Sequence, residues 1–229
     1  SNKNRVALLT KKIDKIIGSK IKNKKIAFLG VTFKPNTDDM RDSTSLNMIP
    51  YLCKKGAKVT YYDPTGEKDE FKKIKNVNFS KNIKGKLIFE YDLKKTNWFN
   101  IGGKAKAFFK PDSLSELVLF LREFGKEEKI LALGAGSNIL IKDELFDGVV
   151  IRLGKNFSNV SMLPNGIIVA GSACTDKKLS DFALENEIGG LEFLACIPGT
   201  VGGGLKMNAG CFNKEFKDIL VSIQAIDRS

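Results

Sequence analysis

The sequence predicts two folded units of different class, an α/β unit in residues 1–84 and an α+β unit in residues 85–229. The first observation is charge: the first part carries twenty Lys and Arg against eight Asp and Glu, and the second carries eighteen of each, so the whole net charge of +12 lies in the first. The second observation is a strand–helix–strand pattern in the first part, and the third is a series of short strands in the second. So sharp a break in charge indicates two units of different origin.

The bulk composition limits the possible functions. With 42% hydrophobic and 28% charged residues, the 229-residue chain has a globular composition. It shows no signal peptide and no apolar run near the roughly 20 residues that span a bilayer, so we expect no membrane partner and a cytoplasmic location with reduced cysteines. The absence of histidine excludes imidazole catalysis and His-ligated zinc, and we expect no metal site.

The first unit predicts a parallel βαβ arrangement. In chain order we expect a helix over 6–17, a strand over 25–30, a helix over 45–55 closed by Gly56, and a strand over 58–62. In such sheets ligands bind beyond the carboxyl ends of the strands, where the loop 31–44 begins. This loop has no G-x-G-x-x-G, so Lys34 and Arg41 either bind another anion, for example a diphosphate, or are solvated.

The residues of this loop carry a resemblance. Gly30-Val-Thr-Phe-Lys-Pro-Asn-Thr-Asp-Asp-Met-Arg-Asp-Ser43 resembles the signature of the UDP-binding domain of the UDP-glucose/GDP-mannose dehydrogenases, and the similarity to UDP-glucose 6-dehydrogenase extends to about Asn82. The resemblance implies that Phe33 and Lys34 contact a UDP-sugar and that Arg41 contacts NAD. The many lysines are scattered without a recognition motif, so we expect no specific nucleic-acid binding and either a solvated surface or a steering field for anionic UDP-sugars.

The second unit predicts alternating short strands and two helices. Ser113 and Glu116 form a capping box before a helix with an apolar face of Leu114, Leu117, Val118 and Leu121. A second helix is expected over 175–186, with Leu179, Phe182 and Ala183 directed inward. The expected strands lie at 129–133, 139–141, 149–153, 160–163 and 167–170, and a strand-like run follows at 221–226.

Three glycine-rich segments stand out in the second unit: Asn97–Gly103, Gly134–Asn138 and Ile197–Gly204. The middle segment fits an anion-binding nest of backbone N–H groups, although a tight turn between strands would use the same residues. Glycines also let backbone approach a planar ligand closely. Three such segments in one unit indicate a large, phosphate-bearing cofactor.

A second resemblance covers residues 86 to 229. Asn97-Trp-Phe-Asn-Ile-Gly-Gly-Lys-Ala105, Leu133-Gly-Ala-Gly-Ser-Asn-Ile-Leu140, Gly190-Leu-Glu-Phe-Leu194, Ile197-Pro-Gly-Thr-Val-Gly-Gly203 and Met207-Asn-Ala-Gly210 together resemble the UDP-N-acetylenolpyruvoylglucosamine reductase (UDP-N-acetylmuramate dehydrogenase) family. This implies a two-lobed FAD-binding domain of the vanillyl-alcohol-oxidase type. Cys196 replaces the usual Gly, and Cys211-Phe212-Asn213 replaces the usual Ala-Tyr-Gly.

The resemblance also implies the residues that bind FAD. Gly134–Ile139 match the loop for the FAD pyrophosphate, and Gly199–Gly203 match the loop beside the flavin ring. The complete set expected to bind FAD is Gly102, Gly103, Gly134, Ala135, Gly136, Ser137, Asn138, Ile139, Pro198, Gly199, Thr200, Val201, Gly202, Gly203 and Asn208.

The sequence therefore favours an FAD-dependent, NADPH-using reductase of UDP-N-acetylglucosamine enolpyruvate in peptidoglycan synthesis. The alternatives are an NAD-dependent UDP-glucose 6-dehydrogenase and a binding module for FAD or UDP-sugar without turnover. The chain opens without Met, and the catalytic residues of both families fall outside the matched positions, so we expect a fragment with no catalytic residue. Nothing in the sequence predicts an oligomeric state.

Overall fold

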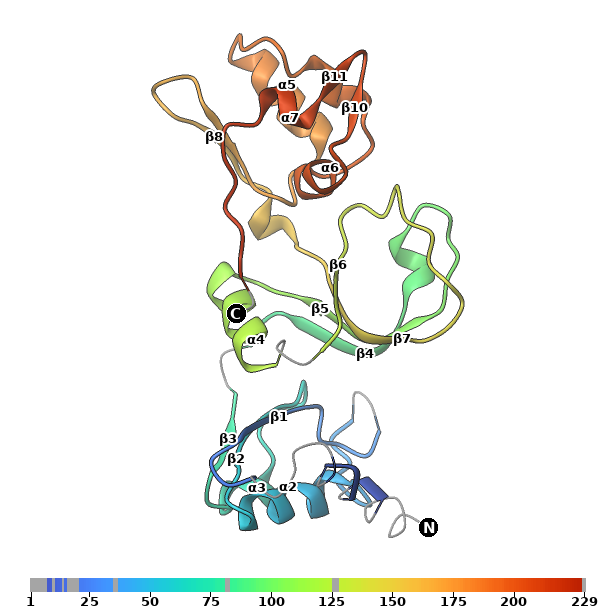
Figure 1. Cartoon of the computed structure of the whole chain (residues 1–229), viewed down its shortest axis with the longest axis vertical. Coiled ribbons are helices and arrows are strands. Elements are labelled where there is room, and N and C mark those ends of the chain that lie inside the picture. The colour runs from blue at the N-terminus through green and yellow to red at the C-terminus, as the bar shows by residue number, and fades with distance from the viewer. Residues whose placement is uncertain are drawn as a thin grey trace. The chain divides into compact units, whose positions relative to one another are not determined.

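The computed structural model describes residues 8–9, 11–13, 15, 21–34, 37–80, 83–124 and 128–227 (Figure 1). The chain divides into two compact units, one made of residues 1–84 and 119–127 and the other of residues 85–118 and 128–229. The first unit is α/β and the second is α+β, which confirms the predicted fold class. In the described part, no helix is both long and apolar enough to cross a membrane.

The first unit contains a three-stranded parallel sheet. Its strands lie in the order β1 (Lys25–Leu29), β2 (Lys58–Tyr62) and β3 (Val77–Phe79), and the helices α2 (Ser45–Lys54) and α3 (Asp69–Lys72) connect them. The register places Lys25 opposite Lys58 and Val59 opposite Val77. The predicted strand–helix–strand unit is therefore confirmed, and β3 adds a third strand that the sequence pattern did not reveal.

Apolar residues at the predicted spacings form the core of this unit. Ile49 and Leu52 of α2 are fully buried in one cluster with Val59 and Tyr61 of β2. Phe71 of α3 meets the Tyr61 ring edge-on, with 5.2 Å between the ring centroids. These contacts fix the helices against the sheet, which in turn places the loop after β1 at the carboxyl ends of the strands.

The predicted opening helix lies partly in the described residues. Leu9 and Ile13 are helical there. The other predicted apolar positions of that helix (Val6, Ile16 and Ile17) lie outside the described residues.

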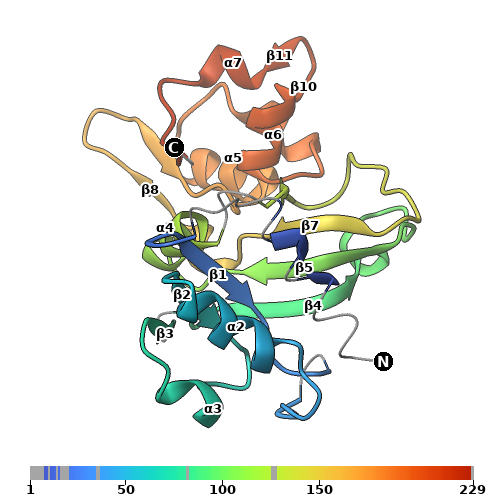
Figure 2. The same ribbon diagram turned by 60° about the horizontal axis from the view of Figure 1, so that its bottom comes forward.

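The second unit begins with a mixed four-stranded sheet in the order β4–β5–β7–β6, and Figure 2 shows the first three of these strands side by side. β4 (Lys86–Asp92) is antiparallel to β5 (Lys104–Lys110), whereas β7 (Phe146–Ile151) is parallel to β5 and to β6 (Ile130–Ala132). The short helix η1 (Leu93–Thr96) follows β4, and α4 (Leu114–Glu123) follows β5. Leu93, Ala105, Phe108, Leu133 and Val150 form a buried cluster.

The remaining elements of the second unit surround a separate core, which agrees with the predicted two-lobed domain. That core consists of Cys174, Leu179, Phe193, Leu194, Val201 and Phe216. The elements in chain order are η2 (Lys155–Phe157), the hairpin β8 (Val160–Met162) and β9 (Ile168–Ala170), α5 (Asp176–Glu185), η3 (Glu192–Cys196), α6 (Val201–Met207), the pair β10 (Gly210–Cys211) and β11 (Lys214–Glu215), and α7 (Phe216–Ile219).

The predicted helix over 175–186 is confirmed as α5. The Thr175 hydroxyl caps it by accepting the Lys178 N–H at 3.2 Å, and Asn186 follows its last turn. Leu179 and Ala183 are buried as expected, and Phe182 is half-buried.

Two strand predictions were wrong. Residues 139–141 form no strand: Ile139 and Ile141 pack singly against the cluster of Leu93, and the backbone between them pairs with no neighbouring strand. Residues 221–226 are irregular, and Val221 and Ile223 are exposed. In both segments the apolar composition indicated a strand, but a strand also requires a partner for its backbone groups.

The apolar face predicted for α4 was wrong in two of its four positions. Leu117 and Leu121 are buried, but Leu114 and Val118 are 50% and 40% exposed. Phe120 and Phe124 are buried instead, at helical spacing from Leu117 and Leu121. The two phenylalanines belong to the same i, i+3, i+4 series, and the correct stripe is therefore rotated relative to the expected one.

The predicted capping box at the start of α4 forms only in part. The Ser113 hydroxyl accepts the Glu116 N–H at 3.2 Å. The Glu116 carboxylate turns elsewhere, because its Oε1 accepts the Gly85 N–H at 2.5 Å and its Oε2 accepts the Asp112 N–H at 2.6 Å. Gly85 lies so close to Lys110 and Pro111 that a Cβ would overlap their backbone. Glu116 thus ties the first residue of the second unit to the end of β5.

Replacing Glu116 by Ala is expected to destabilise the second unit by about 2–5 kcal/mol, because the amides of Gly85 and Asp112 lose their acceptor where Glu116 is 5% exposed. Urea unfolding followed by circular dichroism measures the difference. Glu123→Ala on the exposed face of the same helix is the matched control and is expected to change stability by less than about 0.5 kcal/mol. Equal midpoints for the two variants would contradict this role.

Candidate functional site

Two buried charged side chains hold the loop at the carboxyl ends of β1 and β2. The Asp63 carboxylate accepts the Val31 N–H at 2.9 Å and the Thr65 N–H at 3.0 Å. Lys68 is only 6% exposed at its side chain, and its Nζ lies 2.8 Å from Asp38 Oδ1 and 3.8 Å from Asp63 Oδ1. This hydrogen bond lowers the pKa of Asp38. Sequence reasoning missed Lys68, since nothing distinguishes it from the other lysines until its burial is known.

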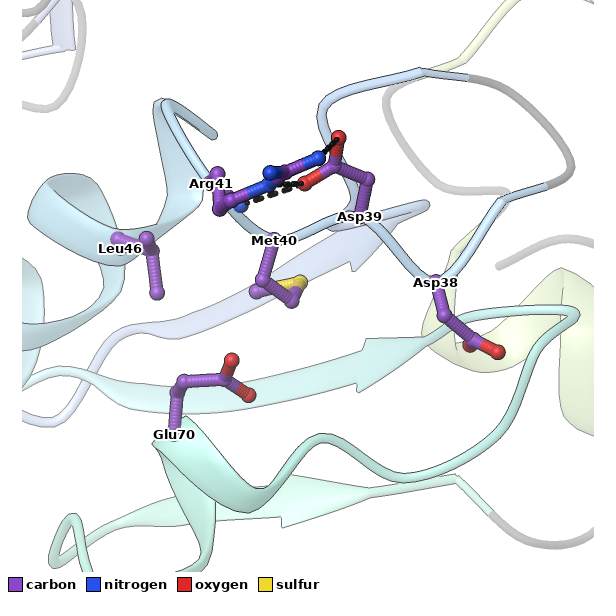
Figure 3. Close-up of a pocket in the computed structure, with 6 residues that line it drawn as sticks. All are labelled: Asp38, Asp39, Met40, Arg41, Leu46 and Glu70. Carbon is purple, nitrogen blue, oxygen red and sulfur yellow. Dashed lines mark hydrogen bonds and ion pairs between the residues drawn. The ribbon is translucent and has the colours of Figure 1, made fainter.

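An open pocket lies along this loop (Figure 3), lined by Asp38, Asp39, Met40, Arg41, Leu46 and Glu70. The Arg41 guanidinium is bound to both oxygens of Asp39, at 2.9 Å and 3.1 Å, and this contact lowers the pKa of Asp39. An anionic ligand would therefore have to compete with Asp39 for Arg41. The contact between Arg41 and NAD stays a prediction.

Phe33 and Lys34 lie on the same loop as Arg41. The Phe33 N–H donates to the Asp39 carbonyl at 2.7 Å, so the two predicted binding segments lie side by side. The Lys34 carbonyl accepts the hydroxyls of Thr32 and Thr37, which turns the backbone at this point. The Phe33 ring is 46% exposed and Lys34 is exposed, so both side chains are available to a ligand.

In the second unit, the first and second glycine-rich segments are in direct contact. The Trp98 N–H donates to the Gly136 carbonyl at 3.0 Å. Gly136 has φ +75°, and a Cβ there would overlap the Thr96 carbonyl and lie 2.8 Å from Asn97 Cα. Only glycine fits this position, for both reasons. Asn97 fixes the first segment from within, because its Nδ2 donates to the carbonyls of Leu93 and Ile101.

The third glycine-rich segment meets the second at Thr200. A Cβ at Gly134 would lie 2.7 Å from Thr200 Oγ1 and 3.8 Å from Gly203 Cα. Thr200 is also paired with Thr175 in an isolated antiparallel bridge, which attaches this segment to the start of α5. The structure therefore brings together the three glycine-rich segments, which are distant in sequence.

The second segment has the features of an anion-binding nest. The amides of residues 134–139 donate to no acceptor among the described residues, and only residue 138 of this stretch is exposed. Amides in a half-buried stretch need partners. Successive free N–H groups on a glycine-containing loop suit a pyrophosphate, so this segment fits the phosphate part of a dinucleotide. This fit favours the nest over the simple turn.

The third segment differs from the second, because the amides of Val201 and Gly202 already donate to protein carbonyls. The Val201 N–H donates to the Cys174 carbonyl and the Gly202 N–H to the Ser172 carbonyl, both at 2.9 Å. Val201 to Met207 are helical rather than a loop. Val201 and Gly202 thus build the wall of the site and cannot donate these N–H groups to a ligand without breaking the bonds.

Gly102, Gly103 and Asn208 serve the local fold. A Cβ at Gly102 would lie 2.6 Å from Ile141 Cγ2, and the Gly103 N–H donates to the Lys142 carbonyl at 2.8 Å. The two glycines let the segment after the nest pack closely on the first glycine-rich segment. Asn208 ends α6 with φ +47°, and its Oδ1 accepts the Lys217 N–H. Contacts of these three residues with FAD stay predictions.

Asp176 is a buried carboxyl group at the edge of this site. It is fully buried, neither of its side-chain oxygens has a partner in the described residues, and a Cβ on Gly199 would lie 2.5 Å from its Oδ2. Loss of solvent raises the pKa of Asp176 to about 6. Sequence reasoning missed this residue, because an Asp in the first turn of a helix is an ordinary partner of the helix dipole.

Comparisons with known proteins match the two units separately. Residues 105–229 match a family model described as "FAD binding domain", and residues 27–93 match the "UDP-glucose/GDP-mannose dehydrogenase family, UDP binding domain". Both resemblances seen in the sequence are therefore confirmed.

Among curated proteins, the chain is similar to UDP-N-acetylenolpyruvoylglucosamine reductases. The protein of Pelagibacter ubique (strain HTCC1062) is 74% identical over 151 residues, which cover 66% of this chain and 50% of the relative. That of Rickettsia akari (strain Hartford) is 49% identical over 145 residues, which cover 63% and 49%. The chain spans about half the length of the curated relatives it matches.

A solved structure is also similar, the crystal structure of UDP-N-acetylenolpyruvylglucosamine reductase (MurB) from Thermus caldophilus. It is 29% identical, covers 58% of this chain and 45% of its own, and superposes with a TM-score of 0.48.

The buried carboxyl of Asp176 gives a pH prediction. Its pKa is higher in the folded than in the unfolded chain, so the folded state holds the proton more tightly and stability falls as pH rises from about 4 to about 6. Above that range the ionised group costs about 2–3 kcal/mol. Asp176→Asn is therefore expected to remove this fall and to be the more stable protein at pH 8, as measured by urea unfolding at successive pH values.

The matched control is Asp181→Asn on the same helix. Asp181 is exposed and paired with Lys177, so its loss is expected to change stability by about 0.5 kcal/mol or less and to leave the fall between pH 4 and 6 in place. If wild type and Asp176→Asn lose stability in parallel across this range, Asp176 is not a buried ionising group.

Proposed function

Because the chain belongs to the FAD binding domain family, whose model matches more than half of its residues, we propose that the C-terminal region, residues 85–229, binds FAD. The observation that carries this proposal is the row of amides at residues 134–139 that have no acceptor among the described residues and lie against the other two glycine-rich segments. A dinucleotide cofactor needs such a nest for its pyrophosphate and close backbone approach beside its ring.

Each segment has its own part in holding the cofactor. Gly134–Ile139 bind the pyrophosphate through their backbone N–H groups, and the Ser137 and Asn138 side chains add polar contacts. Pro198–Gly203 form the wall beside the flavin ring. This wall is held in place by the hydrogen bonds from Val201 and Gly202 to the segment just before α5. The chemistry that FAD supplies when bound is hydride transfer. The residues of this chain bind and orient it.

We further propose that the activity served by this site is reduction of UDP-N-acetylglucosamine enolpyruvate to UDP-N-acetylmuramate, with NADPH as reductant, in cytoplasmic peptidoglycan synthesis. Support comes from the curated relatives, which are named UDP-N-acetylenolpyruvoylglucosamine reductases. No residue of this chain is assigned a catalytic role.

A specific observation favours a second function for the N-terminal region, residues 1–84: binding of a UDP-sugar. Residues 27–93 match the UDP binding domain model, and the loop presents an exposed Phe33 and Lys34 at the carboxyl ends of the parallel strands. Lys34 supplies a cation for the diphosphate and Phe33 an apolar surface. NAD-dependent oxidation of UDP-glucose and binding without turnover are the two activities that fit this unit.

Gly136→Ala is expected to weaken FAD binding at least tenfold, because the new Cβ would push the nest away from Thr96 and Asn97. Quenching of flavin fluorescence on titration measures the affinity. Emission of Trp98 gives a second readout, since it is the chain's single tryptophan and its N–H is bonded to the nest.

Gly166→Ala is the matched control for this variant. Gly166 has φ +77°, nearly that of Gly136, but nothing lies within 4 Å of the added Cβ. Both variants therefore place a Cβ on backbone of nearly the same left-handed φ, and only Gly136→Ala disturbs the nest. Equal FAD affinity in both, with both folded by circular dichroism, would refute the assignment of residues 134–139 to the cofactor.

For the first unit, Lys34→Ala is expected to reduce UDP-glucose affinity about 10- to 100-fold, the effect of losing one charge-assisted hydrogen bond to a diphosphate. Isothermal titration calorimetry measures it, with Lys75→Ala as a control of equal charge at another exposed position. The assignment fails if wild type binds UDP-glucose and Lys34→Ala binds it equally well.

A further inference from the structure

We propose that Cys196 and Cys211 form a thiol pair that hydroperoxides oxidise to a reversible disulfide, which clamps the segment carrying Pro198–Gly203. The existence of the pair is independent of FAD binding. Its effect on the cofactor rests on the proposed function.

The geometry places Cys211 against the helix that ends in Cys196. The Cys211 thiol donates to the Phe193 carbonyl at 3.0 Å. Phe193 and Cys196 both belong to the 3-10 helix η3, in which residues three apart lie directly above one another. The sulfur of Cys211 is thus beside the turn that carries Cys196, and this proximity is also seen in the pKa of Cys211, which burial and Cys196 both raise.

The surroundings give the two thiols different roles. Cys196 is exposed, so a peroxide can reach it. Cys211 is half-buried, and its pKa is raised by burial and by the neighbouring Cys196. Exposed thiols are the ones that oxidise first, and a nearby protected thiol then resolves the product.

The chemistry balances with a hydroperoxide as oxidant. The Cys196 sulfur attacks the O–O bond of hydrogen peroxide, becomes a sulfenic acid and releases one water. The Cys211 sulfur then attacks the Cys196 sulfur, and the hydroxyl group leaves as a second water with the thiol proton. Two thiols lose two electrons in total, and one peroxide is reduced to two waters. A dithiol reductant reverses the step by thiol–disulfide exchange.

The bond would join the two ends of one functional segment. Between Cys196 and Cys211 lie the wall residues Pro198–Gly203, all of α6 and its cap Asn208. Linking the ends limits the motion of everything between them. We therefore expect the oxidised protein to have a higher melting temperature and to release bound FAD more slowly than the reduced protein.

The other two cysteines serve as internal references. Cys174 is fully buried, its thiol donates to the Thr175 carbonyl, and burial raises its pKa. Cys53 lies on α2 in the first unit and is half-buried. Neither is expected to react at the peroxide concentration that oxidises Cys196.

Peptide mapping tests the pair directly. The whole chain is treated with equimolar hydrogen peroxide, its remaining thiols are alkylated, and it is digested with trypsin without reductant. Because Lys206 lies between the two cysteines, the bond must join peptide 179–206 to peptide 207–214. We expect this linked species, its loss on dithiothreitol treatment, and no linked dimer on a non-reducing gel.

Three variants sharpen the test. Cys211→Ser should leave a sulfenic acid at Cys196 that dimedone traps, Cys196→Ser should leave Cys211 unmodified, and Cys53→Ser should form the linked peptides like wild type. The proposal is overturned if Cys196 proceeds to sulfinic acid in wild type without linked peptides, or if the only disulfides join Cys53, Cys174 or two chains.

The clamp is tested separately on protein loaded with FAD. Slower FAD release in the oxidised wild type, but not in peroxide-treated Cys196→Ser, supports it. An unchanged release rate with the disulfide in place overturns the clamp. If the chain takes up no FAD, the proposed function fails while the peptide map still decides the thiol pair.

Discussion

The close approach of Gly136 to the backbone of Thr96 and Asn97 is the contact on which the candidate cofactor site depends. At this point no side chain fits, and the backbone has a left-handed φ of +75°. The contact holds the nest at residues 134–139 against the Trp98 segment, and the amides of the nest have no acceptor in the part of the chain that the structure describes. Thr200 of the third segment packs against the nest at Gly134. Glycine at position 136 is therefore required for packing. The same packing leaves the amides of the nest available to a ligand.

Different interactions hold the candidate binding loops of the two units in place. In the first, buried charges do it: Asp63 holds the start of the loop that carries Phe33 and Lys34, and Lys68 holds its middle at Asp38. In the second, close contacts of Gly134 and Gly136 with Thr200, Thr96 and Asn97 hold the loop, and the buried carboxyl group of Asp176 lowers stability instead of holding a loop. The distinct family matches of the two regions parallel this difference.

Local patterns predicted the elements that depend on local interactions. The βαβ unit, the capped helix after Thr175 and the strands expected at 129–133, 149–153, 160–163 and 167–170 were correct because spacing, caps and turn residues determine them. The predictions that failed concern features that depend on tertiary contacts. Residues 221–226 have strand composition but no partner strand, the buried stripe of α4 includes Phe120 and Phe124, and Glu116 binds Gly85 instead of its own cap. At the site, the three glycine-rich segments were foreseen, but the burial of Lys68 and Asp176 had no signal in the sequence.

If the nest formed by residues 134–139 holds the pyrophosphate of FAD, equilibrium dialysis of the purified chain will show it in the stoichiometry of bound FAD. We expect one FAD per chain, displaced by ADP, which shares the pyrophosphate, and not by riboflavin, which lacks it. A folded chain that retains no FAD, or one from which riboflavin displaces FAD while ADP does not, would contradict it.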